Sequence, residues 1–139
     1  MRIRASTDRM TPLAVQKLKP GQSIPVLQCA AGLAWLASQP ESERTKILDA
    51  TIPAPGEVMW KRPQLESTLV ETQRRGYALF RRPQRYSAMI GLSVPVRIAG
   101  HVDAALSVRF AERALPVAAA REKFLPHLVA AAARLAAAR

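Results

Sequence analysis

The sequence contains a single cysteine, two histidines and few aromatic residues among its 139 positions. A lone cysteine, Cys29, excludes a disulfide bond within the chain and is typical of a reducing compartment. No apolar run approaches the roughly 20 residues that a membrane-spanning helix needs, and the first residues do not form an apolar signal segment. We therefore expect a cytoplasmic protein with no membrane partner.

Patterns that carry catalytic or metal chemistry are also missing. His101 and His127 have no cysteine, carboxylate or second histidine at metal-ligand spacing. No G-x-S-x-G nucleophile motif occurs, and no glycine-rich loop precedes a helix as phosphate binding requires. Cys29 lies in an alanine-rich stretch, where a small buried thiol is more common than a nucleophile. The sequence predicts no enzyme activity, no metal site and no cofactor.

Acidic residues are scarce, with 10 Asp and Glu against 21 Lys and Arg and a net charge of +11. No acidic residue lies between Glu71 and Asp103. That stretch contains a basic strip with interleaved rings: Arg74, Arg75, Tyr77, Phe80, Arg81, Arg82, Arg85 and Tyr86. Arginines that neutralise phosphates and rings that stack on bases would make a nucleic-acid-binding module, which is one functional alternative. A solvated basic face is the other interpretation of the strip.

The clearest pattern that is present spans residues 88–110, where apolar residues alternate with small or polar ones. This period of two predicts two antiparallel strands joined by a turn at Gly100. One face is aliphatic, and the other combines Gly91, Ser93, Ser107 and Arg109. Small residues with a few donors suit the floor of a pocket for a small acidic ligand. A polar, solvated sheet face is the alternative.

The rest of the chain predicts helices around this hairpin. Residues 27–37 form a helix whose small residues Cys29, Ala30, Ala31 and Gly32 permit a close approach by another element or a ligand. Helices are expected from Pro40 to about residue 49 and from Pro63 to Gly76, followed by a strand at 77–81. A final helix begins near Pro116, and Pro126 is expected to kink or split it. Short extended stretches are expected at 1–6 and 13–18. The fold class is therefore α+β with an antiparallel sheet.

Three stretches, taken in order, resemble one family. SIPVLQCAAGLAWLA followed by PESERTKIL is similar to the L-P-L-H-A-T-A-L-G-K-A-L-L-A segment and acidic helix start of the effector-binding domain of IclR-type bacterial transcription regulators. QLESTLVETQRRGYAL resembles the next helix of that domain with its R-G-Y signal, and IGLSVPVRIAGHVDAALSVRF resembles its hairpin. The match extends from about Leu13 to the end. The closing AERALPVAAAREKFLPHLVAAAARLA resembles the branch of the family that governs breakdown of aromatic acids.

The resemblance implies a single GAF-like domain over residues 1–139 that binds a small metabolite and acts through homodimers or homotetramers. It also implies that the family's first strands and its N-terminal winged helix-turn-helix are missing from this chain, so that DNA is read only through an absent domain. The family's ligand cavity lies between the sheet and the small-residue helix start. On this sequence the resemblance places Cys29, Ala30, Ala31 and Gly32 at its lip and Gly91, Ser107 and Arg109 on the sheet.

The sequence departs from the family at several of these positions. Gly91 replaces a frequent cysteine, Arg109 replaces a small or hydroxyl residue, and Leu27 replaces the usual histidine. FRRPQR at 80–85 stands where the family has an acidic run. Because a guanidinium binds a carboxylate through two parallel hydrogen bonds, we expect Arg109, helped by Ser107 and Arg81, to hold an aromatic or short-chain acid. An Arg109 that only extends from the strand end into water is the alternative.

Overall fold

The structure is a computed structural model that describes residues 1–12, 14, 17–51, 60–81 and 89–138. Three antiparallel strands form the sheet in the order β1-β2-β3, with bounds Ala78–Arg81, Met89–Ile98 and His101–Ala111. The α-helices are α1 (Ala30–Ala37), α2 (Glu41–Thr51), α3 (Arg62–Arg75) and α4 (Val117–Ala137). Two short 3-10 turns, η1 (Asp8–Met10) and η2 (Val26–Gln28), precede α1. The predicted α+β class with an antiparallel sheet is confirmed.

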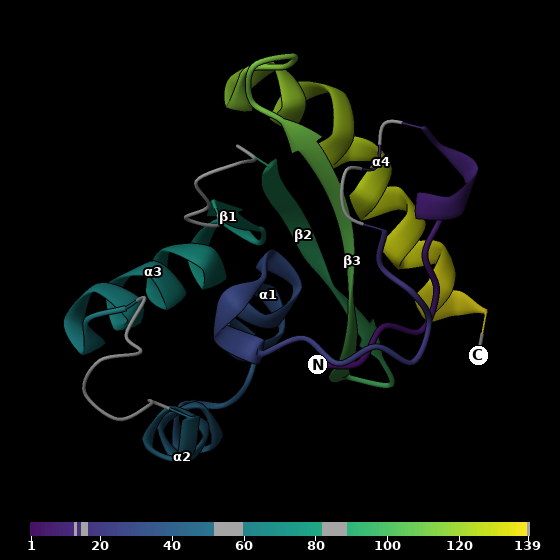
Figure 1. The fold of residues 1–139 in the computed structure, drawn as a ribbon. Coiled ribbons are helices and arrows are strands. Elements are labelled where there is room, and N and C mark those ends of the chain that lie inside the picture. The colour runs from purple at the N-terminus through teal and green to yellow at the C-terminus, as the bar shows by residue number, and fades with distance from the viewer. Residues whose placement is uncertain (13, 15–16, 52–59, 82–88, 139) are drawn as a thin grey trace.

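The sheet separates two hydrophobic cores. On one face α1 packs against the strands and α3 packs on α1, while α4 covers the opposite face and α2 lies farthest from the sheet (Figure 1). The core on the α1 side is built on Leu33, Leu65 and Phe80, and the core on the α4 side on Leu92, Phe110 and Leu128. The aliphatic face of the hairpin is therefore the face that α4 buries, and the small, polar face is turned toward α1.

The hairpin forms as its alternation predicts. Ala99 and Gly100 make the turn with φ values of 50° and 84°, a left-handed conformation that glycine adopts without steric cost. A register shift between Val96 and Arg97 separates the turn from the regular part of the ladder. Beyond it the pairing is continuous to Met89 and Ala111 at the far end. The strands thus hold the small, polar residues in fixed rows across the sheet.

Two helical expectations need correction. The predicted helix at 27–37 is broken at Cys29, whose extended backbone (φ −154°, ψ 153°) ends η2 and starts α1 at Ala30. In the last helix the split expected at Pro126 does not occur, because α4 runs continuously from Val117 to Ala137, while the kink stays a prediction. Pro126 is exposed, so water can satisfy the carbonyl group that the missing proline N–H leaves without a helical partner. No helix among the described residues is long and apolar enough to cross a membrane.

The described part of the first 24 residues runs outward and returns before α1 begins, as the purple-to-blue trace in Figure 1 shows. Backbone hydrogen bonds from Ile3 N to Gln22 O and from Gly21 N to Ile3 O tie the two ends of this N-terminal segment together. The extended stretch expected at 1–6 is reduced to an isolated bridge between Arg2 and Ser23. The stretch expected at 13–18 lies partly outside the described residues.

Candidate functional site

Two neighbouring rows on the α1-facing side of the sheet bring together four of the predicted site residues. Gly91 of β2 lies opposite Arg109 of β3, and Ser93 lies opposite Ser107 in the next row on the same face. The four residues that the sequence alternation placed on one face of the hairpin therefore lie on one face in the structure. Its open part lies on β3, because Ser93 is buried whereas Ser107 is exposed and the Arg109 side chain is 25% exposed.

The two serines form a short chain of hydrogen bonds. The Ser107 hydroxyl donates to Ser93 Oγ at 2.8 Å, and the Ser93 hydroxyl donates to the carbonyl oxygen of Leu106 at 3.0 Å. The donor capacity of both hydroxyls is thus used within the sheet, while the Oγ of the exposed Ser107 retains acceptor capacity. In this arrangement the serine pair offers an acceptor to an incoming group.

Arg109 is held by a carboxylate from the N-terminal segment. Its Nη2 lies 2.6 Å from Oδ2 of Asp8, which is 101 positions away in the sequence. The same Oδ2 accepts the backbone N–H of Leu18 at 2.8 Å. Asp8 is only 18% exposed, so this ion pair is partly shielded from water and salt. Arg109 therefore does not extend freely into solvent.

The start of α1 lies directly over the Gly91 row. A Cβ on Gly91 would stand 3.0 Å from the Ala30 methyl group, so the glycine lets the helix approach the strand closely. A Cβ on Gly32 would stand 1.8 Å from the carbonyl oxygen of Val26. The sequence placed both glycines around a hollow. In the structure they instead allow neighbouring segments of the chain to pack closely. Cys29 and Ala31 remain half-buried beside them.

Cys29 caps α1, since its Sγ accepts the Gly32 N–H at 3.2 Å. Replacing Cys29 by alanine removes this acceptor and is expected to lower the free energy of unfolding by about 0.5–1 kcal/mol, whereas serine keeps an acceptor and is expected to match the native protein. Urea unfolding of the two variants measures the difference. Equal losses in both would show that the cap contact contributes nothing.

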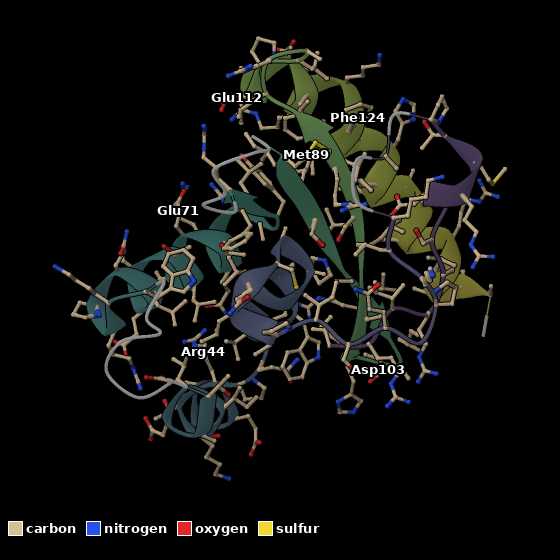
Figure 2. The ribbon with its side chains drawn as sticks, in the orientation of Figure 1. Arg44, Glu71, Met89, Asp103, Glu112 and Phe124 are labelled. Carbon is tan, nitrogen blue, oxygen red and sulfur yellow. The ribbon has the colours of Figure 1, made fainter. Side chains whose placement is uncertain are left out.

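Arg81 is not brought together with the other predicted site residues. It pairs with Ile90 across β1 and β2, which places it on the α4-facing side of the sheet. Its guanidinium binds both carboxylate oxygens of Glu112, the residue that follows β3 and is labelled in Figure 2. The sequence could not reveal this, because the face of a short strand depends on its register with its neighbour.

The described part of the basic strip is engaged within the protein. Arg74 holds Glu71 through two hydrogen bonds, of 2.9 and 2.5 Å, and this guanidinium lowers the pKa of the Glu71 carboxyl. The Arg75 guanidinium stacks on the Tyr77 ring, with its central carbon 4.5 Å from the ring centroid. Phe80 is buried in the α1-side core and cannot stack on a base. The residues at 82, 85 and 86 lie outside the described part of the chain. These contacts do not favour the nucleic-acid alternative.

Asp8 is the site residue that sequence reasoning missed. One signal was available, since Asp8 is the sole acidic residue among the first 40 positions, which also carry Arg2, Arg4, Arg9, Lys17 and Lys19. Its pairing with an arginine near the other end of the chain depends on the tertiary fold and leaves no mark in local spacing. Among the described residues no group of three or more His, Cys, Asp and Glu could hold a metal ion.

The sequence over residues 7–137 matches the family described as bacterial transcriptional regulator IclR, C-terminal. Solved structures share its fold. The transcriptional regulator RHA06195 of Rhodococcus sp. RHA1 aligns with a TM-score of 0.78 and 17% identity, covering 91% of this chain and 52% of that one. The chain thus spans about half of the Rhodococcus regulator.

Two isolated domains are also similar. The C-terminal domain of E. coli KdgR aligns with a TM-score of 0.73 and 22% identity, covering 88% of this chain and 77% of that one. The inducer-binding domain of Acinetobacter PobR, a double mutant in complex with 3-hydroxybenzoic acid, aligns with a TM-score of 0.70 and 19% identity, covering 91% of this chain and 75% of that one. At these identities the likeness concerns the fold alone.

Proposed function

The chain belongs to the IclR-type bacterial transcriptional regulators as a C-terminal domain of that family, and from this premise we propose that it senses a small carboxylic acid on the α1-facing side of the sheet. The family consists of transcriptional regulators rather than enzymes. In this proposal the chain is one effector-binding domain that works as a homodimer or homotetramer, and DNA is read by a domain outside this sequence.

The observation that carries the proposal is the placement of Arg109. It lies on the same face of β3 as Ser107, opposite the Gly91 on which Ala30 of α1 packs, and its side chain is only 25% exposed. Burying a guanidinium is costly unless a carboxylate accompanies it, and Asp8 does so here. A position built to hold one carboxylate can hold that of a ligand, through the bidentate geometry that arginine offers.

The PobR relative supports the chemical class of the ligand. A double mutant of its inducer-binding domain forms a complex with 3-hydroxybenzoic acid, which combines an aromatic ring, a carboxylate and a hydroxyl. On this chain a carboxylate would meet Arg109, and a ligand hydroxyl could donate to Ser107 Oγ, which retains acceptor capacity. We therefore propose an aromatic or short-chain acid, with hydroxybenzoates as the first compounds to test.

The test is thermal unfolding and calorimetric titration of the purified chain with benzoate, 3-hydroxybenzoate and succinate, with benzamide as the uncharged comparison. A ligand that binds only the folded state at a hundredfold excess over its dissociation constant adds about 2.7 kcal/mol of stability. Arg109→Ala is expected to weaken acid binding by roughly tenfold or more, because hydrogen bonds to charged groups contribute about 1.5–3 kcal/mol.

Arg81→Ala is the matched control, since it removes one arginine and one ion pair from the opposite face of the sheet. It is expected to change acid affinity by less than about twofold, as surface substitutions away from a site usually do. Equal losses in the two variants would contradict the site, as would a lack of response to every acid. A salt-sensitive response to an oligonucleotide alone would instead favour nucleic-acid binding.

A further inference from the structure

The ion pair between Asp8 and Arg109 differs from the other salt bridges among the described residues. Each of those joins side chains that are at least 32% exposed, whereas Arg109 is 25% and Asp8 18% exposed. They also connect neighbouring turns or surface elements, while this one joins the N-terminal segment to the middle of the candidate site. A contact that is this shielded and this distant in sequence holds the segment against the sheet.

Asp8 is also one point at which the described part of the N-terminal segment is fastened to the sheet. Its Oδ2 accepts hydrogen bonds from both Leu18 N–H and Arg109 Nη2, so Asp8 links Leu18 to β3. The base of the segment is fixed separately, by the bonds between Ile3 and the residues at 21 and 22. Loss of the contact between Asp8 and Arg109 would therefore remove one attachment of Asp8 and Leu18 to β3 while leaving the bonds of the base in place.

We propose that Asp8 is a built-in competitor for the acidic ligand, so that binding exchanges one carboxylate on Arg109 for another and loosens Asp8 from the sheet. The inference rests on the proposed function. Two carboxylates crowded on one guanidinium repel each other, and Asp8 occupies an N–H of Nη2. An acid that binds the edge containing this N–H through two hydrogen bonds therefore displaces Asp8. The exchange lowers the apparent affinity for the acid and couples its binding to a movement of the N-terminal segment.

Asp8→Asn in the full chain tests the exchange. The amide oxygen can still accept Leu18 N–H, but the charge that competes for Arg109 is gone. We expect affinity for 3-hydroxybenzoate to rise about fivefold or more, since a competing charge-assisted hydrogen bond has been removed. In the native protein the acid is expected to speed amide hydrogen exchange at residues 8–12, whereas in Asp8→Asn exchange at these residues is fast without ligand.

Asp103→Asn is the matched control, because it removes the same charge from an exposed position at the start of β3, at the opposite end of the strand from Glu112 (Figure 2). It is expected to leave affinity and exchange at native values. An Asp8→Asn affinity within twofold of the Asp103→Asn value, or native exchange at residues 8–12 that slows on ligand binding, would overturn the inference. If either outcome occurs while the native protein binds acids and Arg109→Ala abolishes that binding, the role of Asp8 is contradicted but the proposed function is not. If no acid binds the native protein or Asp8→Asn, both proposals fail.

Discussion

Gly32→Ala is expected to lower the free energy of unfolding by about 3 kcal/mol, at the upper end of the cost of overpacking a tight site. The new Cβ would lie 1.8 Å from the carbonyl oxygen of Val26 and 2.6 Å from its carbon. These are backbone atoms, so no flexible side chain can move aside. Either η2 or the start of α1 must shift, and urea unfolding followed by circular dichroism measures the cost.

Gly91→Ala provides a graded comparison for this variant. Its Cβ would meet the Ala30 methyl group at 3.0 Å, a side-chain contact that a small displacement of α1 can relieve. Alanine also reduces the freedom of the unfolded chain, so we expect a net loss of about 1 kcal/mol or less. If Gly32→Ala were no less stable than Gly91→Ala, the close packing of η2 on α1 would not be a constraint on the fold.

The same contact links stability to the candidate site. Gly32 donates its N–H to Cys29 Sγ. The residue after Cys29, Ala30, packs closely on Gly91, which lies opposite Arg109 in the sheet. A displacement of the first turn of α1 would therefore move this helix start relative to the strand residues of the candidate site. The small residues of this helix start set the distance between the two, and bulk added there should reduce ligand affinity together with stability.

The parts of the fold that the sequence could predict are those with local causes. The hairpin follows from alternation over residues 88–110, and the end of α3 follows from Gly76, whose φ of 81° is the left-handed conformation that closes a helix. The face of the sheet that carries Ser93, Ser107 and Arg109 follows from the same alternation. Each of these features depends on neighbours within one element.

The parts that the sequence could not predict depend on contacts between distant elements. Pro126 is tolerated within α4 because that helix is fastened along the sheet by Ala120, Leu128 and Ala132. The face of Arg81 depends on how β1 aligns with β2, and the partner of Arg109 lies 101 positions away. Local propensity is overridden where tertiary contacts contribute more than the local cost.

Leu92→Ala is expected to lower the free energy of unfolding by about 3–4 kcal/mol, within the range for large-to-small changes in a packed core. Leu92 is fully buried at the middle of the central strand, paired with Leu79 on one side and Val108 on the other. It faces α4, so its loss leaves a cavity bounded by a sheet and a helix that cannot both collapse. Val70→Ala, at a position 58% exposed on α3, is expected to cost less than about 0.5 kcal/mol.

The Leu92→Ala variant also tests whether the two cores unfold together. The only tryptophans, Trp35 and Trp60, pack on the α1 side, whereas Leu92 belongs to the α4 side. Because β2 contributes to both faces, we expect one cooperative transition in which tryptophan fluorescence and circular dichroism change at the same urea concentration. A fluorescence midpoint that stayed at its native value while the dichroism midpoint fell would show that the α1 side, with the candidate site, keeps its structure without the packing of α4.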